Sequence, residues 1–279
     1  MNEYHKVSYD ISKVLTNAYS TSFSLGIKAF APQYRDAIYA VYGYVRVADE
    51  IVDTFHGFDK KHLLDKFRKD TYEALETGIS TNPIIHSFQK VVNQYGIDKE
   101  LVEVFLNSME MDLYENYYER DEYDNYIYGS AEVVGLMCLK VFVNGNEKEY
   151  NKLKYSAQML GAAFQKVNFL RDIKADIDER KRIYLPGVDR EELINDTNKQ
   201  KLEKEIEREF NEALKGILQL PIGVKLGVYS AFQYYYGLFG KIKSLSVKDL
   251  LSRRVRISNI KKIVLLFKSF IEIKILKTA

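Results

Sequence analysis

Only four prolines, at positions 32, 83, 186 and 221, interrupt the 279-residue sequence, so long stretches remain free to form helices. Within these stretches apolar residues recur mostly three and four positions apart, which is the spacing of one helix face, and strand-like alternation is scarce. The sequence therefore predicts an all-α fold of roughly ten helices. Its length allows one large hydrophobic core, and we expect a single domain over residues 1–279.

The same periodicity places the helices. We expect them over 8–19, from Pro32 past Asp53, and over 61–77, 83–95, 98–119, 147–177 and 201–218, with a further helix opening at Pro221. The run 20–24 is either a hydroxyl-rich turn or the cap of the next element. Gly129 and Gly135 lie in an apolar helical segment, where each costs about 1 kcal/mol relative to alanine. They indicate close helix contact or room for a ligand.

Composition restricts the class of protein. The hydrophobic fraction of 46% and charged fraction of 29% are those of an ordinary globular protein, and the net charge of +2 argues against a dedicated nucleic-acid binder. The single cysteine, Cys138, excludes an intrachain disulfide framework and suits a reducing compartment. The first residues lack an apolar signal region, and no window of about 18 uncharged apolar residues occurs. We therefore expect a cytoplasmic protein without a membrane span.

One face of the helix predicted over 147–177 carries oxygen-bearing side chains at helical spacing. These are Gln165, Asn168, Asp172 and Asp176. Two carboxylates four residues apart repel each other and cost a helix roughly 0.2–0.5 kcal/mol. Such a row is useful if it faces Mg²⁺, which takes one or two carboxylates and leaves its other positions to water and phosphate. An acidic, solvated helix face would explain this stretch alone equally well.

A second stretch far upstream favours the metal interpretation. Asp49 and Asp53 again lie four residues apart in a helical run, and Arg46 precedes the first of them by three residues. Two acidic faces on two helices could converge on a shared metal cluster, with arginines nearby for an anionic ligand. Either motif alone is weak evidence, and the pair together is stronger.

With both aspartate motifs in view, the sequence resembles the squalene/phytoene synthase family of head-to-head prenyl transferases over nearly its full length. Further segments match that family in the same order. They are Ser20-Thr21-Ser22-Phe23, Tyr42 with Arg46, Met109-Glu110-Met111-Asp112-Leu113, Tyr128-Gly129 with Val133, Val134 and Gly135, the 165–176 motif, Arg182-Ile183-Tyr184-Leu185-Pro186, and Tyr235 with Arg254. Two positions depart from the family pattern. Glu50 replaces the second aspartate of the first motif, and Lys181 replaces a common glycine.

The resemblance implies an isoprenoid-synthase-type helical bundle around a central active-site cavity. It assigns Asp49, Asp53, Asn168, Asp172 and Asp176 to Mg²⁺, for which Mn²⁺ can substitute. It assigns substrate binding to Ser20, Thr21, Ser22, Phe23, Tyr42, Arg46, Gln165, Arg171, Tyr235 and Arg254. The four aspartates and Tyr128 would be catalytic, with Tyr128, Tyr42 and Phe23 forming an aromatic wall that stabilises carbocations.

The activity implied by the resemblance is the condensation of two geranylgeranyl diphosphates to phytoene through a cyclopropyl diphosphate, in carotenoid biosynthesis and without NADPH. The Met-Glu-Met-Asp-Leu segment and the length favour this product. The alternative is a C30 enzyme that makes dehydrosqualene or squalene from two farnesyl diphosphates. A remote alternative is a catalytically silent helical scaffold that binds lipid or a partner protein.

The C-terminal segment from Arg253 to Lys277 mixes basic residues with large apolar ones. A basic amphipathic helix of this kind can lie on an anionic membrane surface, and a last helix that docks on the core would show the same pattern. We expect prenyl diphosphates as ligands, possible peripheral membrane contact through this helix, no nucleic acid, and a monomer or weak homodimer.

Overall fold

The computed structural model describes residues 2–114, 118–180, 184 and 194–276. In these ranges the chain forms thirteen α-helices and three π-helical segments, and no strand, which confirms the all-α prediction. The elements are α1 (Asn2–Tyr19), α2 (Thr21–Lys28), α3 (Pro32–Asp53), α4 (Lys60–Thr77), α5 (Pro83–Tyr95), α6 (Lys99–Tyr114), α7 (Arg120–Ile127), η1 (Tyr128–Glu132), α8 (Val133–Phe142), α9 (Glu147–Ala175), η2 (Asp176–Arg180), α10 (Asp196–Ile217), α11 (Ile222–Lys243), α12 (Val247–Ser252), α13 (Asn259–Phe270) and η3 (Ile271–Leu276).

Side-chain caps explain several boundaries that differ from the prediction. Ser20 accepts a hydrogen bond from the backbone N–H of Phe23 at 3.2 Å, so the run 20–24 caps and opens α2 and is not a turn. The helix expected over 98–119 is interrupted, because Glu119 is extended and forms a capping box with Glu122 that starts α7. Asn195 caps α10, which therefore begins five residues before the expected start at 201. The short helix α12 was not predicted.

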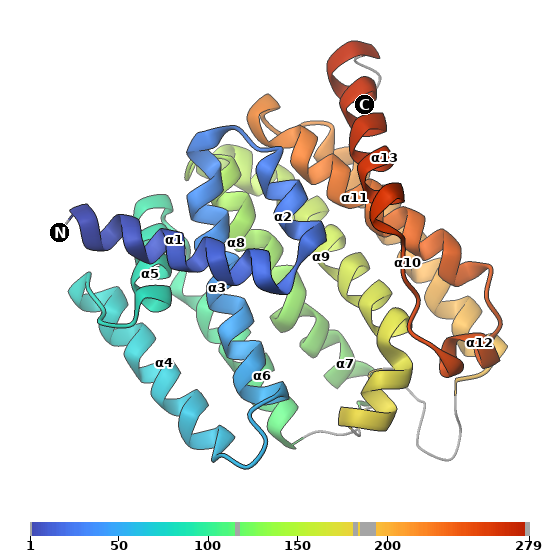
Figure 1. Cartoon of the computed structure of the whole chain (residues 1–279), viewed down its shortest axis with the longest axis horizontal. Coiled ribbons are helices and arrows are strands. Elements are labelled where there is room, and N and C mark those ends of the chain that lie inside the picture. Colours follow the sequence, from blue (N-terminus) through green and yellow to red (C-terminus); the bar gives the residue numbers. More distant parts are fainter. Residues whose placement is uncertain (1, 115–117, 181–183, 185–193, 277–279) are drawn as a thin grey trace.

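Helix α9 runs through the middle of the molecule (Figure 1). It packs against α8 and η1 on one side and against α10, α11 and α12 on the other. Helix α3 packs against α1, α5, α6 and α8 instead, on the far side of α8 from α10. One cluster of buried apolar side chains connects these layers, from Ile27 in α2 to Ile273 in η3.

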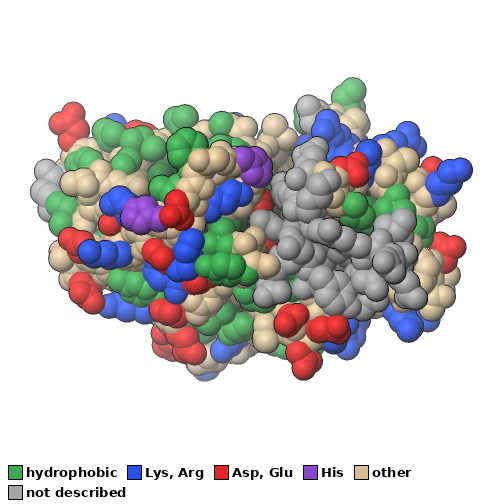
Figure 2. Space-filling view, turned by 90° about the horizontal axis from the view of Figure 1, so that it is seen from below, with side chains coloured by type: hydrophobic (Ala, Val, Ile, Leu, Met, Phe, Trp, Pro, Cys, Tyr) green, Lys and Arg blue, Asp and Glu red, His purple; other side chains and the backbone are tan. Residues whose placement is uncertain are grey.

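Charged side chains of opposite sign are interspersed on the face of the molecule shown in Figure 2. Along α4, for example, Lys61 pairs with Asp65 at 2.5 Å and Lys66 pairs with Asp70 at 3.1 Å, one helical turn apart. Among the helices of the described ranges, none is long and apolar enough to cross a membrane.

The two glycines singled out in the sequence mark close helix contacts. A Cβ at Gly129 would lie 2.7 Å from the Cβ of Ser108 on α6, and one at Gly135 would lie 2.8 Å from the carbonyl oxygen of Ala157 on α9. Gly135 also lines the central cavity. Larger residues here would push η1 and α8 away from their neighbours, which explains why the helix penalty of glycine is tolerated.

A buried ion cluster joins α9 to α10. Lys166 on α9 is 3% exposed, and its ammonium group binds Glu209 Oε1 at 2.5 Å and also Glu205. Arg120 from α7 contacts the same Glu205 at 3.0 Å. Burial raises the pKa of the Glu209 carboxyl to about 7, although Lys166 beside it acts in the opposite direction. The positive charge of Lys166 is therefore required by two carboxylates that have little access to water.

We predict that Lys166→Met lowers the free energy of unfolding by about 3–5 kcal/mol, because it leaves the paired carboxylates without their buried cation. Glu209 has a folded-state pKa above its unfolded value, so its ionisation destabilises the fold as pH rises. The deficit of the variant should accordingly be larger at about pH 8 than at about pH 6, and urea denaturation at both values measures it.

Lys152→Met is the matched control. Lys152 lies on the same helix with a side chain 52% exposed, and it pairs with Glu149 at 3.7 Å. Its loss should change stability by no more than about 0.5 kcal/mol. Equal effects of the two substitutions would contradict the role given to the buried cluster.

Candidate active site

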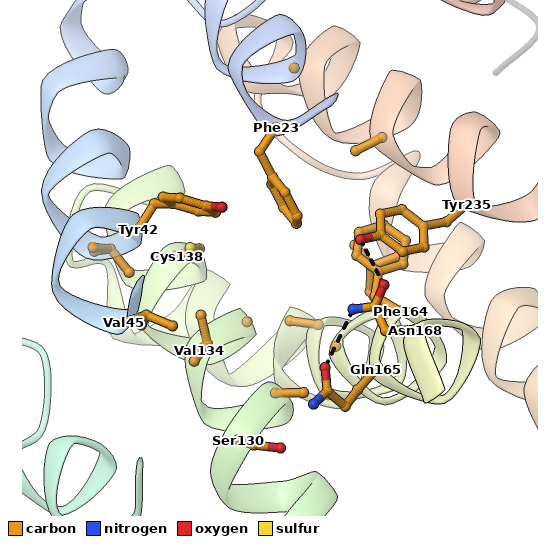
Figure 3. A pocket seen from close by; sticks show the side chains of 18 of the residues that line it. Phe23, Tyr42, Val45, Ser130, Val134, Cys138, Phe164, Gln165, Asn168 and Tyr235 are labelled. Atoms are coloured by element: carbon orange, nitrogen blue, oxygen red, sulfur yellow. Dashed lines mark hydrogen bonds between the residues drawn. The ribbon is translucent and has the colours of Figure 1, made fainter. Parts of the chain in front are cut away.

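A cavity of about 470 Å³ lies among α2, α3, α8, α9 and α11. Its walls are largely apolar, and Figure 3 shows side chains from these elements pointing into it, among them Phe23, Val45, Val134 and Phe164. The size is typical of a small-molecule site, and the apolar walls suit a hydrocarbon ligand.

The lining changes from apolar to charged along two helices. On α3 it passes from Ile38 and Val41 to Asp49 and Asp53, and on α9 it passes from the small and apolar residues 153–164 to the charged residues of the 165–176 motif. The two helices run in the same direction through the molecule, so their charged ends lie at the same end of the cavity (Figure 1). Residues of both aspartate motifs therefore line one cavity.

Asp172 is held by two arginines. Arg171 donates two hydrogen bonds to it, at 3.0 and 2.5 Å, and Arg254 approaches it with Nε at 2.6 Å from Oδ1 and Nη2 at 3.2 Å from Oδ2. Arg171 is largely buried, with a side chain 18% exposed, whereas that of Arg254 is 49% exposed. These contacts bring the segment after α12 to the charged end of α9.

On the opposite wall, Arg46 pairs with two acidic residues of its own helix. It donates to Asp49 Oδ2 at 2.5 Å and forms an ion pair with Glu50 one turn further on. Glu50 also accepts a hydrogen bond from Thr54 at 2.6 Å. Glu50 is absent from the cavity lining, whereas Asp49 and Asp53 belong to it. The departure from the family motif therefore falls on a residue beside the cavity.

Between the two walls, Tyr235 on α11 connects to the amides of α9. Its hydroxyl donates to Asn168 Oδ1 at 3.2 Å, and Asn168 Nδ2 donates to Gln165 Oε1 at 3.4 Å (Figure 3). The Tyr235 ring stacks on Phe164 with centroids 3.9 Å apart. Burial raises the pKa of Tyr235 to about 12, so its hydroxyl stays protonated and able to donate.

Phe23 and Tyr42 complete an aromatic wall. Phe23 projects between Tyr42 and Tyr235, with ring centroids 5.5 and 6.3 Å away (Figure 3). Burial raises the pKa of Tyr42. Three ring systems from α2, α3 and α11 thus face the cavity close to its charged end.

A tyrosine cluster that the sequence did not predict surrounds Asp112. This carboxylate is 5% exposed and accepts hydrogen bonds from Tyr126 at 2.8 Å, Tyr184 at 2.8 Å and Tyr118 at 3.2 Å. Asp112, Tyr126 and Tyr184 all line the cavity, and Tyr184 stacks on Phe169 with ring centroids 4.4 Å apart. Asp112 lies in the Met-Glu-Met-Asp-Leu segment, and its match to the family was the sequence feature that could have drawn attention to this cluster.

Twelve of the sixteen residues proposed from the sequence line this cavity. They are Phe23, Tyr42, Arg46, Asp49, Asp53, Gln165, Asn168, Arg171, Asp172, Asp176, Tyr235 and Arg254. The other four, Ser20, Thr21, Ser22 and Tyr128, are not part of its lining. Ser20 caps α2, Thr21 accepts a hydrogen bond from Lys262 at 3.0 Å, and Ser22 lines a small side pocket between α2 and α11.

Tyr128, which was predicted to belong to the aromatic wall, does not line this cavity, whereas Tyr126 does. Residues two apart in a helix point to nearly opposite sides, so only one of these tyrosines can face the cavity. Tyr128 packs on the hydrophobic core instead, where burial and the carboxylates of Glu132 and Glu100 raise its pKa. Lys181 and the 182–186 match, apart from Tyr184, lie outside the described residues.

The donor set at the charged end suits a hard cation, since it consists of carboxylate and amide oxygens. In the described part of the chain, no group of three or more Asp, Glu, His or Cys side chains is close enough to hold a metal ion by itself. Mg²⁺ commonly uses one or two carboxylates and completes its shell with water and phosphate. The residues therefore fit a cation that binds together with a phosphate ligand, on Asp49 and Asp53 of one wall or Asn168, Asp172 and Asp176 of the other.

A family model described as squalene/phytoene synthase matches residues 16–261. The chain belongs to the squalene/phytoene synthase family. The enzymes of this family are prenyltransferases. The match spans both aspartate motifs and every described helix from α2 to α12, which confirms the resemblance drawn from the motifs.

Among curated relatives in the family, the chain is 28% identical to 15-cis-phytoene synthase of Synechocystis over 93% of this chain and 83% of the relative. It is also 28% identical to phytoene synthase 2 of Solanum lycopersicum, over 93% and 88% of the two chains. Phytoene synthase 1 of Arabidopsis thaliana is 27% identical over 92% of this chain. The chain spans 64% of the length of that Arabidopsis protein.

Solved structures show the same fold at lower identity. A dehydrosqualene synthase bound to a ligand superposes with a TM-score of 0.82 at 20% identity, covering 98% of both chains. Squalene synthase HpnC of Alicyclobacillus acidocaldarius superposes with a TM-score of 0.74 at 18% identity, covering 86% of this chain and 94% of HpnC. This family member therefore has the helical fold of those synthases.

We predict that Asp112→Leu lowers the free energy of unfolding by about 2–5 kcal/mol, because three tyrosine hydroxyls lose their shared buried acceptor. Asp112→Asn keeps one acceptor oxygen in the same place and should cost clearly less. Urea denaturation of both variants tests the ranking. A leucine variant as stable as the wild type would mean that the cluster contributes nothing to folding.

Proposed function

We propose that this protein is a phytoene synthase, which condenses two molecules of geranylgeranyl diphosphate head to head. The observation that carries the proposal is that the apolar walls of one cavity end in aspartates and arginines from both α3 and α9. Such a cavity offers separate environments for an isoprenoid chain and for a diphosphate group.

The charged end would bind the two diphosphate groups. Arg46, Arg171 and Arg254 can each donate two hydrogen bonds to phosphate oxygens, exchanging their present carboxylate partners for the ligand. Gln165 and Tyr235 would add neutral donors. Mg²⁺ held by the aspartates would neutralise the phosphate charge and make diphosphate a better leaving group. The aspartates, released from their arginines, would then become available to the cation.

The reaction would proceed in two ionisations. Loss of diphosphate from one substrate gives an allylic cation, and the double bond of the second substrate attacks it and loses a proton to form a cyclopropylcarbinyl diphosphate. Loss of the second diphosphate, rearrangement of the cation and loss of a second proton give the linear hydrocarbon. Each turnover therefore gives one hydrocarbon molecule, two diphosphate ions and two protons.

The aromatic wall would protect these cations. Phe23, Tyr42, Tyr126 and Tyr235 line the cavity near the charged end, and the negative faces of their rings attract positive charge. The apolar lining excludes water that would otherwise quench the cations. Tyr126 would thus supply the ring that the family resemblance assigned to Tyr128.

The choice of a C20 substrate is supported by the curated relatives, which are named phytoene synthases, and by the Met-Glu-Met-Asp-Leu segment. A C30 enzyme would use the same site with farnesyl diphosphate. Purified protein with Mg²⁺ and no nicotinamide cofactor should convert geranylgeranyl diphosphate to a C40 hydrocarbon with a conjugated triene, identified by chromatography and absorbance. Farnesyl diphosphate offered alone should give much less product.

Three results would contradict this assignment. A C30 product formed in preference would keep the reaction type and change the substrate. A product that requires NADPH would make the enzyme a reductive synthase. Folded protein that forms no hydrocarbon from either substrate, with or without NADPH, would favour a silent scaffold.

We predict that Asp172→Ala lowers turnover at least about a hundredfold, because it removes a cation ligand and the anchor of two arginines. The variant should also lose Mg²⁺-dependent binding of inorganic diphosphate in calorimetry, while its circular dichroism shows that it remains folded. Asp70→Ala, on the exposed face of α4, is the control and should leave both properties unchanged. Near-normal turnover of the Asp172 variant would refute the assignment of the charged end.

A further inference from the structure

Helix α13 carries apolar side chains on two faces. On its inner face, Leu266 and Lys262 line the side pocket together with Ser22 of α2 and Tyr234 of α11. Lys262 also donates a hydrogen bond to Thr21 and lies 5.4 Å from the Tyr234 ring centroid. The inner face of α13 therefore packs against α2 and α11, and its other apolar face takes no part in this contact.

The second face is exposed to solvent. The exposed fractions of its side chains are 76% for Ile260, 60% for Ile263, 58% for Val264, 64% for Phe267 and 42% for Phe270. Their spacing of three, one, three and three residues places them in one stripe along the helix, about 15 Å long from first to last. Single exposed apolar residues are common, but five in one stripe mark an interaction surface.

Basic residues accompany the stripe. Lys261 is exposed, Lys268 has a side chain 59% exposed, and Arg253 and Arg256 are exposed in the segment leading to α13. Over the described residues from 253 to 273 the acidic side chain is Glu272, which is paired with Lys268 at 3.7 Å. An apolar stripe flanked by cations matches a lipid surface that is apolar in depth and negative at its headgroups.

We propose that α13 docks this protein on the surface of a bilayer that contains anionic lipid, with the stripe inserted among the acyl chains. A second copy of the chain fits the surface less well, since an identical stripe with basic flanks would offer Lys261 and Lys268 no acidic partners. The proposal stands independently of the reaction proposed above.

The position of α13 connects this surface to the cavity. The side pocket beneath the helix shares Phe23 and Tyr235 with the wall of the main cavity. A bilayer against α13 would therefore lie beside the two helices, α2 and α11, that enclose the apolar chamber. This places a lipid phase next to a site built for long hydrocarbon chains.

Vesicle flotation without substrate tests the proposal. The full chain should float with vesicles of phosphatidylcholine and phosphatidylglycerol, bind less to vesicles of phosphatidylcholine alone, and dissociate as salt is added. Val264→Glu with Phe267→Glu should lower the vesicle partition coefficient at least about tenfold. The substitutions remove two apolar side chains from the stripe, and the two new carboxylates would have to leave water to enter the acyl-chain region. Lys261→Glu with Lys268→Glu should remove the preference for anionic vesicles.

The matched control replaces one valine and one phenylalanine of similar exposure elsewhere. Val14 is 68% exposed on α1 and Phe58 is 72% exposed between α3 and α4, so Val14→Glu with Phe58→Glu makes the same chemical change away from α13. Unchanged binding of this control supports the proposal. Three results would overturn it: no binding by the wild type, an equal loss in the control, or a dimer in solution that the α13 variant abolishes.

Discussion

The structure depends on the position of α9, a helix that packs against several neighbours along its middle and also carries charge at one end. Its middle residues meet α8, η1, α10 and α11, so it has no solvated face there on which to place Lys166. That lysine is balanced by Glu205 and Glu209 of α10, which holds the helix in one rotational setting. The same setting directs Asn168 and Asp172 into the cavity. The core cluster and the candidate site are therefore coupled through one helix.

The charged end of the cavity is balanced by its own arginines. Asp172 is paired with Arg171 and Arg254, and Asp49 is paired with Arg46, so the carboxylates do not repel one another without compensation. Such pairs at a partly buried site are close to break-even, because the cost of removing both charges from water offsets their attraction. A ligand that brings phosphate and a divalent cation offers the arginines an anion and the aspartates a cation. Exchanging the present arginine–aspartate pairs for these contacts therefore needs little net free energy.

The sequence predicted most of the helices and brought together the charged residues that line one end of the cavity, because both follow from helical periodicity and the two aspartate motifs. It could not determine which tyrosine faces the cavity. Tyr126 and Tyr128 differ by about half a turn, and the choice depends on the phase of α7 and the π-helical segment η1 that follows it. The role of Ser20 was equally undetermined, because the hydroxyl that suits a phosphate also suits a helix cap. The Asp112 cluster joins residues 72 positions apart, which no local pattern reveals.

Glu50 departs from the family motif at a position that does not line the cavity. Residues 49 and 53 share a helix face, whereas residue 50 is rotated by about 100° and points beside the cavity. There a carboxylate on a longer side chain reaches both Arg46 and Thr54, so it steadies the arginine that faces the ligand site. An aspartate at the same position would have a shorter reach to an arginine one turn away. The substitution therefore keeps both flanking aspartates in the cavity and changes only how Arg46 is held.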